Sequence, residues 1–227
     1  MWQLSIDAVM AGAMTRKPAR TRLPPADRRA QLVGHAIGCF ADHGLARATQ
    51  AQVAERAGVS VSAVYSYFRT RADLVTAVLD AVADAIAAMV MAADAPPDAR
   101  PDASAMSARE ALTTLAQHTA DMAVEQPDTV RVWLDWSTGV RADVWPRFLA
   151  LQGQLQAHVR ALLARGAPDS PALDSAARLF VGGAHTLALM RFEQVSAAEL
   201  ALFIDQMVGG ALVALRPIAP ETLPPGP

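Results

Sequence analysis

The sequence predicts an all-α protein with about nine helices, and three observations support this prediction. The 227 residues are 52% hydrophobic, and apolar side chains recur at steps of three and four in nearly every segment between prolines. Two-residue alternation and Asn-Gly or Asp-Gly hairpin signals, which are typical of antiparallel strands, are absent. The prolines divide the chain into segments, and none of them lies between Ala26 and Ala95.

The first three expected helices are short and closely spaced. Their spans are 26–43, 49–57 and 61–68. The first helix follows Pro24–Pro25. Thr49 is a good N-cap for the second helix, and Gly58 can take the left-handed conformation that ends it. Ser60 is the expected N-cap of the third helix.

The six later helices are longer, and prolines or polar connectors separate them. Their expected spans are 71–93, 105–125, 128–140, 144–166, 172–192 and 196–216. In the fourth helix, Leu74, Val78 and Val82 lie on one face, as in an amphipathic helix. The last two helices repeat this spacing, whereas the middle ones are bounded by Pro127, Pro146 and further prolines.

The charge distribution divides the chain into a basic head and an acidic body, each with a terminal extension. The expected divisions are a flexible basic arm (1–25), a helix-turn-helix domain (26–70), a regulatory body (71–216) and a disordered tail (217–227). Residues 14–80 carry ten basic and five acidic side chains, whereas residues 81–227 carry ten basic and sixteen acidic ones. A basic head on an acidic body is the charge distribution of many nucleic-acid-binding proteins, although chance clustering of surface arginines would look the same.

The composition excludes several other classes of protein. The single cysteine, Cys39, allows no internal disulfide and no cysteine-clustered zinc site. No apolar run reaches the ~18 residues of a membrane span, and the first fourteen residues lack the basic start of a secretory signal. The five histidines show no metal-ligand spacing, and no phosphate loop or Gly-x-Ser-x-Gly elbow occurs. We therefore expect a soluble cytoplasmic protein that is not an enzyme, with no catalytic residue, metal or cofactor.

The informative stretch is 49–74, where two short helices meet at a tight turn that contains Gly58. This arrangement is a helix-turn-helix, whose second helix fits the major groove of DNA. Val53, Val64 and Phe68 would form its buried side. The exposed side offers hydroxyl and methyl groups that suit base edges and phosphates: Ser62, Ala63, Tyr65, Ser66 and Tyr67.

The block 28–79 resembles the N-terminal domain of TetR-family transcriptional regulators. The shared pattern consists of Phe40 and Gly44 at the end of the first helix, Thr49, the run Ala57-Gly58-Val59-Ser60, Tyr65 and Phe68, and Arg71 and Leu74. The resemblance implies a homodimer that binds palindromic double-stranded DNA and regulates transcription, with a ligand-binding and dimerisation body beyond the fourth helix.

Segments 19–29, 65–75 and 132–148 are also similar to the LuxR/HapR-type quorum-sensing regulators, a subgroup with the same fold. This similarity implies minor-groove contacts by Arg20 and Arg22, phosphate contacts by Tyr67 and Arg71, and base contacts from the third helix. The full expected set of DNA-binding residues is Arg20, Arg22, Thr49, Gln50, Ser60, Ser62, Ala63, Tyr65, Ser66, Tyr67 and Arg71. Tyr65 could instead pack partly in the core, and the two arm arginines could belong to a merely basic tail. Ser66 departs from the subgroup, which usually has Asn there.

For the body, the resemblance implies a pocket between helices that accepts a small hydrophobic ligand. The expected lining is Val82, Ile86, Met89, Met122, Trp133, Trp136, His185 and Leu189, with His118 or Gln117 as further polar anchors. The alternative is a filled core. Small residues at Gly182–Gly183 and Gly209–Gly210 favour a homodimer through the helices at 172–192 and 196–216, where close approach forms a four-helix bundle.

These features predict a sequence-specific, ligand-responsive transcriptional regulator of the TetR type that is related to quorum sensing. The alternative is a protein of the same fold whose body engages a protein partner, as nucleoid-occlusion factors do. A well-formed apolar pocket would favour the first hypothesis, and a closed core beside a large exposed apolar patch would favour the second.

Overall fold

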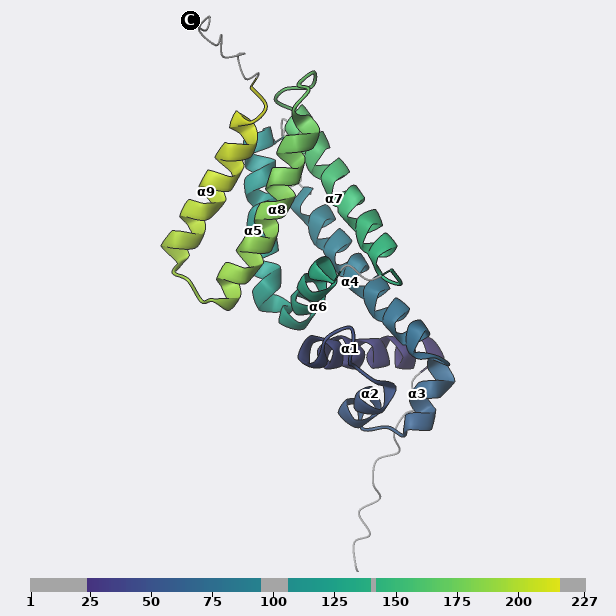
Figure 1. Ribbon diagram of the computed structural model, residues 1–227. Helices are drawn as coiled ribbons and strands as arrows, with labels where there is room; N and C mark the ends of the chain where they lie inside the picture. Colours follow the sequence, from purple (N-terminus) through teal and green to yellow (C-terminus); the bar gives the residue numbers. More distant parts are fainter. Residues whose placement is uncertain (1–23, 95–105, 140–141, 217–227) are drawn as a thin grey trace, which may run out of the picture.

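The computed structural model describes residues 24–94, 106–139 and 142–216, which form nine α-helices (Figure 1). In chain order these are α1 (Pro25–His43), α2 (Gln50–Ala57), α3 (Val61–Tyr67), α4 (Arg71–Asp94), α5 (Ala108–Glu125), α6 (Pro127–Thr138), α7 (Trp145–Ala164), α8 (Leu173–Phe192) and α9 (Ala197–Val213). The predicted all-α fold is confirmed, and predicted ends differ from observed ones by at most about three residues, a usual uncertainty at helix termini. The expected tail (217–227) and the expected arm (1–25), apart from residues 24 and 25, lie outside the described residues, as do residues 95–105 and 140–141.

Local sequence signals account for where the helices begin and end. Thr49 and Gln52 form a capping box at the start of α2, because each side chain bonds to the backbone N–H of the other. Gly58 ends α2 in the left-handed conformation, with φ of 63°, which a residue with a side chain rarely adopts. Ser60 then caps α3 by accepting a hydrogen bond from the backbone N–H of Ala63.

The helices form a head and a body that α4 connects. Figure 1 shows α1–α3 together at one end, with α4 running from this head into the bundle of α5, α7, α8 and α9, and α6 lying between the two parts. One apolar cluster joins the head to α6 and the first half of α4, and a second fills the bundle. Leu74 and Val78 of α4 belong to the first cluster and Val90 to the second, so a single helix packs in both.

Within the described residues, one segment of α4, Arg71–Ala93, is long and apolar enough to cross a membrane by length and composition alone. The segment packs in both apolar clusters, as the core helix of a globular protein does. This packing accounts for its apolar composition.

Candidate nucleic-acid interface

The helix-turn-helix is built on a buried seam between α1, α2 and α3. Val53 of α2, Val64 of α3 and Phe68 are fully buried and belong to one cluster with Phe40 of α1. The turn is closed by backbone bonds, since the N–H of Val59 donates to the carbonyl of Ala54 across Gly58. This packing fixes one face of α3 against the head and leaves the opposite face outward.

The outward face of α3 carries three of the residues predicted to contact DNA. Ser62, Tyr65 and Ser66 are exposed, whereas Ala63 is half-buried. The two tyrosines are placed differently from each other: Tyr65 is 47% exposed, and Tyr67 is half-buried against the apolar core of the head. The sequence left open that Tyr65 packs partly in the core; in the structure it is Tyr67 that packs there, and Tyr65 is exposed.

Polar groups on and beside α3 already make local hydrogen bonds. The Ser66 hydroxyl donates to the carbonyl of Ala63 at 2.7 Å, and the hydroxyls of Ser60 and Ser62 lie 3.0 Å apart. The side-chain oxygens of Thr49 and Ser60 accept backbone N–H groups as helix caps. Because the Ser66 hydroxyl already donates its proton to the Ala63 carbonyl, its oxygen is left as an acceptor, which can accept a hydrogen bond from a base amino group.

Two other residues in the predicted DNA-contact set turn toward the protein. Gln50 is only 6% exposed, and its amide nitrogen donates to the carbonyl of Phe68 at 2.5 Å. The guanidinium of Arg71 donates through Nε to the carbonyl of Ala48 at 3.0 Å and through Nη2 to that of Leu45. Arg20 and Arg22 lie outside the described residues.

Comparison with known proteins decides the family. The family model for bacterial regulatory proteins of the tetR family matches residues 32–78, which run from α1 into the first turns of α4. The chain is 30% identical over 189 residues to the HTH-type transcriptional regulator LuxR of Vibrio harveyi, and the alignment covers 81% of this chain and 88% of that protein. The chain belongs to the TetR family. It is therefore a DNA-binding transcriptional regulator from a family that binds operators and is not enzymatic.

Solved structures of other transcriptional regulators share the fold at lower sequence identity. A TetR-like regulator from Rhodococcus sp. RHA1 has a TM-score of 0.70 at 17% identity, covering 85% of this chain and 99% of that one. The regulator FadR of Bacillus subtilis, solved in complex with stearoyl-CoA, has a TM-score of 0.64 at 13% identity, covering 82% and 98%. These likenesses show that the α5–α9 body, as well as the head, has the TetR architecture.

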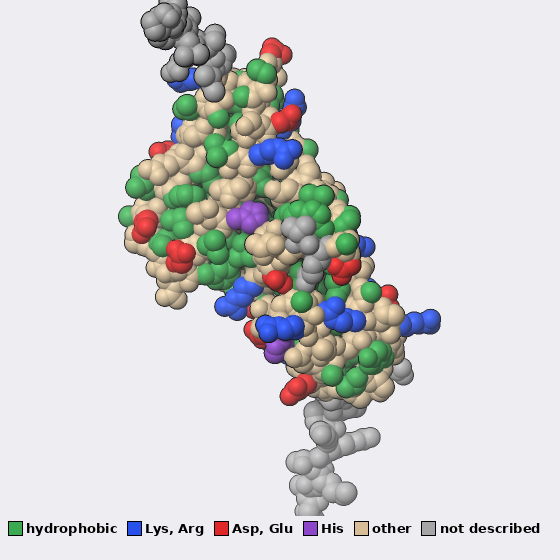
Figure 2. All heavy atoms as spheres, viewed as in Figure 1, with side chains coloured by type: hydrophobic (Ala, Val, Ile, Leu, Met, Phe, Trp, Pro, Cys, Tyr) green, Lys and Arg blue, Asp and Glu red, His purple; other side chains and the backbone are tan. Residues whose placement is uncertain are grey.

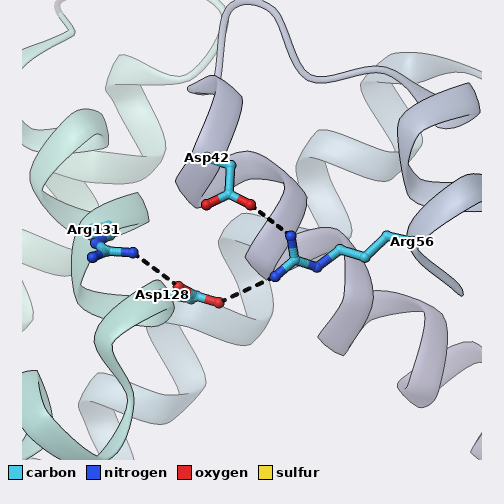
Figure 3. Close-up of polar contacts among 4 residues, drawn as sticks. All are labelled: Asp42, Arg56, Asp128 and Arg131. Atoms are coloured by element: carbon cyan, nitrogen blue, oxygen red, sulfur yellow. Dashed lines mark hydrogen bonds and ion pairs between the residues drawn. The ribbon is translucent and has the colours of Figure 1, made fainter.

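In this TetR-family regulator, an ion-pair network crosses the junction between the head and the body. Figure 3 shows Arg56 of α2 pointing toward both Asp42 of α1 and Asp128 of α6. Its guanidinium lies 2.6 Å from the Asp42 carboxylate and 3.8 Å from that of Asp128, which Arg131 approaches at 3.4 Å. All four side chains are partly exposed, so each pair contributes at most about 1 kcal/mol to stability.

A less exposed contact supports the same junction. The backbone N–H of Leu45, in the turn between α1 and α2, donates to Oδ2 of Asp135 on α6 at 2.7 Å. Leu45 is buried and Asp135 half-buried, so this charge-assisted bond is shielded better than the ion pairs. Sequence reasoning missed Asp135, Arg56 and Asp128 as junction residues, because no local pattern relates partners that lie so far apart in the chain.

The body contains a narrow apolar cavity, and its lining agrees only partly with the predicted pocket. The cavity has a volume of about 50 Å³, and Ile86, Met89, Met122 and Trp133 are among its lining residues. Trp133 Nε1 is buried with no hydrogen-bond partner among the described residues. A space of this size holds one or two water molecules, far less than the ~300 Å³ or more of an ordinary ligand pocket.

The other predicted pocket residues lie outside this lining. Val82 and Trp136 are buried elsewhere in the core, and His185 packs against Trp133 with ring centroids 4.1 Å apart and ring planes tilted by 33°. Leu189 is 49% exposed, because Ala188, one residue and about 100° earlier on α8, takes the inward position. Neither His118 nor Gln117 lines the cavity.

Cys39 is the single cysteine of the chain. It is buried in α1, and burial raises the pKa of its thiol. A buried thiol in its neutral form is unreactive.

Proposed function

We propose that this regulator reads a palindromic operator with the outward face of α3, one α3 helix from each subunit of a homodimer. The observation that supports this proposal is the position of Ser62, Tyr65 and Ser66, which are exposed on one side of a helix whose other side is buried. The half-buried Ala63 adds a methyl group at the edge of that face. Arg20 and Arg22 would extend from the start of α1 into the adjacent minor groove.

Selection of duplexes from a random DNA pool by the unmodified protein, followed by sequencing, tests base reading. We expect an inverted repeat whose half-sites lie about one helical turn apart, near 34 Å. Repeating the selection with Ser66→Ala should relax one base position in each half-site, whereas Gln154→Ala, on the exposed surface of α7, should return the original site. An unchanged site for Ser66→Ala would remove this residue from base reading.

An exposed apolar face on α8 and α9 supports dimerisation. Figure 2 shows hydrophobic side chains distributed over the side of the body formed by these helices. Leu179 and Leu189 of α8 and Leu202 and Val213 of α9 are all about half exposed, at 49–59%. A Cβ atom added at Gly182 or at Gly210 would meet no atom within 4 Å, so neither glycine is needed for packing inside the subunit, and both would let a second copy of this helix pair approach closely. A face of this kind is typical of a helical subunit interface.

Substitutions of equally exposed leucines test the dimer. Leu202→Arg would bury an unpaired charge in the proposed interface and should convert dimer to monomer in analytical ultracentrifugation. Leu149→Arg is the matched control, because Leu149 is 52% exposed on α7, which Figure 1 shows on the opposite side of α8 from α9. Equal behaviour of the two variants would argue against this interface.

The proposed regulation is by a hydrophobic ligand that enlarges the cavity beside Trp133. FadR, which shares the fold, was solved with stearoyl-CoA, and the cavity here lies between α4, α5, α6, α7 and α8, with a mostly apolar lining that also includes Thr119 and His158. A ligand with one hydrogen-bond acceptor would also satisfy the indole N–H of Trp133, whose burial without a partner costs about 1–3 kcal/mol. Titration of neutral and acyl compounds against tryptophan fluorescence tests this proposal, with Trp133→Phe as the variant that lacks the donor.

The small volume of the cavity also favours a second candidate, in which the body binds a protein partner instead of a small ligand. If no compound in the titration binds while the dimer forms normally, this second function becomes the better explanation. The similarity to LuxR further supports a role in quorum sensing in the cytoplasm. A reporter gene fused to the selected operator should then change expression with cell density, and only in cells that carry the regulator.

A further inference from the structure

The side chains of Gln50 and Arg71 connect the two turns that flank the helix-turn-helix. Each side chain starts next to one turn and donates hydrogen bonds to backbone carbonyls of the other turn. The first turn, residues 44–49, joins α1 to α2, and the second turn, residues 68–70, joins α3 to α4. Arg71, the first residue of α4, reaches back to the Leu45 and Ala48 carbonyls of the first turn. Gln50, the first residue of α2, reaches forward to the Phe68 and Thr70 carbonyls of the second turn, at 2.5 and 3.4 Å.

These bonds supply what the recognition helix cannot supply for itself. With seven residues, α3 is too short to be stable alone, and its last carbonyl groups have no partner within the helix. Gln50 provides a donor to the Phe68 carbonyl at the C-cap, and it is buried, so water cannot easily replace it. Arg71 provides two donors from one rigid guanidinium, a geometry that fixes the first turn relative to α4.

The same bonds turn these donors toward protein carbonyls, with Gln50 buried and Arg71 at the exposed start of α4. The Gln50 amide nitrogen faces the carbonyls of Phe68 and Thr70, and the Nε and Nη2 groups of Arg71 face the carbonyls of the first turn. We propose that Gln50 and Arg71 are positioning residues, which set the angle and depth of α3 in the major groove by holding the two turns, and do not read bases or bind phosphates themselves. This assignment replaces the direct contacts that the sequence implied for them.

A positioning role and a phosphate contact predict different dependences on DNA sequence and salt. A lost phosphate contact weakens binding to every duplex alike and makes the salt slope shallower by about one unit. A misplaced recognition helix instead loses the base contacts, so operator affinity falls while binding to unrelated DNA persists. Gln50→Met suits this comparison, because it retains the volume and the zero charge of glutamine but has no donor.

The experiment uses the full-length protein, an operator selected from random DNA and a scrambled duplex of equal length. For Gln50→Met we expect operator affinity to fall about tenfold, with the scrambled duplex changed less than about twofold and the salt slope unchanged. Arg71→Lys, which retains the charge without the planar fork, should show the same pattern. Gln31→Met, at an exposed position on α1, should match the parent protein.

Three outcomes would overturn the proposal. The first is an unchanged operator affinity for Gln50→Met, and the second is an equal loss on both duplexes. The third is full operator affinity for Arg71→Lys combined with a slope about one unit shallower for Arg71→Met on both duplexes, the pattern of a phosphate contact. Amide hydrogen exchange of α3 in the folded Gln50→Met protein separates positioning from unfolding: faster exchange confined to α3 and residues 68–70 supports the proposal, whereas faster exchange throughout the head contradicts it.

Discussion

At the scale of single residues, exposure separates side chains that sequence alone treats as equivalent. Tyr65 and Tyr67 are two positions apart on α3, and the helical step turns the first outward and the second toward the core. An exposed ring contributes little to the stability of the free protein but is available to DNA. A half-buried ring contributes more to the stability of the free protein and is less available to DNA. The two tyrosines should therefore respond differently to the same substitution.

We predict that Tyr65→Ala leaves the free energy of unfolding within about 0.5 kcal/mol of the parent protein and weakens operator binding. Tyr67→Ala removes packing against the head and should lower the free energy of unfolding by about 1–3 kcal/mol. Urea denaturation followed by circular dichroism measures the first quantity, and fluorescence anisotropy with the selected operator measures the second. A larger loss of stability for Tyr65→Ala than for Tyr67→Ala would contradict the placement of these rings.

His185 gives a prediction for pH. Burial against Trp133 lowers the pKa of its imidazole below 6.5, and the hydrogen bond to the Val181 carbonyl opposes this shift without cancelling it. The unfolded chain therefore binds the proton more readily, so the contribution of His185 to stability is complete above pH 6.5 and is lost as the pH falls below that value. The free energy of unfolding of His185→Gln should depend less on pH between 7 and 5 than that of the parent protein.

The control for this measurement is Gln154→Ala, because Gln154 is exposed on α7 and carries no titratable group. Its pH dependence should follow that of the parent protein in urea titrations at pH 7, 6 and 5. If His185→Gln and the parent protein lose stability in parallel, His185 is protonated as easily in the folded state as in the unfolded chain.

Local chemistry determined what could be predicted at this scale. The caps Thr49 and Ser60 and the left-handed Gly58 follow from interactions within three or four residues, and the structure confirms each of them. The orientations of Gln50 and Arg71 depend on carbonyl groups 18 to 26 residues away, so the sequence pattern suggested surface contacts for both. The prediction that Leu189 lines the pocket was wrong for a related reason: α8 carries apolar residues both in the core and on an exposed face, and the sequence pattern does not distinguish the two.

At the scale of elements, α1 shows how one helix serves two neighbours. Gly38 is buried, and a Cβ atom added there would lie 2.5 Å from the guanidinium of Arg56, so the small residue makes room for the ion pairs of that arginine. Gly34, four residues earlier on the same helix, has open space at its Cβ position. The spans of all nine helices followed from proline positions and apolar spacing, but this difference between two glycines of one helix could not.

We predict that Gly34→Ala stabilises the protein by about 0.5–1 kcal/mol, because alanine is favoured over glycine inside a helix. Gly38→Ala has the same propensity gain but displaces the Arg56 side chain and weakens its pairs with Asp42 and Asp128. Its net effect should be smaller than that of Gly34→Ala or opposite in sign. Thermal unfolding of the two variants measures the difference, and an equal gain at both positions would show that Arg56 moves aside at no cost.

At the scale of the whole molecule, the head is joined to the body by two routes. The first is α4, which packs in both apolar clusters, and the second is α6, which holds the head through Asp135 and Asp128. Trp133, in the lining of the cavity, lies on α6 two residues before Asp135. The backbone N–H of Leu45 donates to the Asp135 carboxylate, and the backbone carbonyl of Leu45 accepts a hydrogen bond from Arg71. The first turn, residues 44–49, is therefore held by α6 of the body through one group and by the start of α4 through the other.

The last prediction follows from this arrangement. Asp135→Ala removes the acceptor for the Leu45 N–H, whereas Asp135→Asn retains a neutral acceptor of the same shape. We expect Asp135→Ala to lower operator affinity about five- to twentyfold without a matching loss on scrambled DNA, since the residue acts through the turn; Asp135→Asn should lose less. Asp121→Ala, at an exposed position on α5, is the control.

Any compound that binds beside Trp133 and lowers the affinity for the operator must, by the same factor, bind more weakly when operator DNA is present. Calorimetry of such a compound, with and without operator, should show this factor in the parent protein and a smaller one in Asp135→Ala. Equal factors in both proteins would mean that α4 alone carries the coupling and that the contact between Asp135 and Leu45 only stabilises the junction.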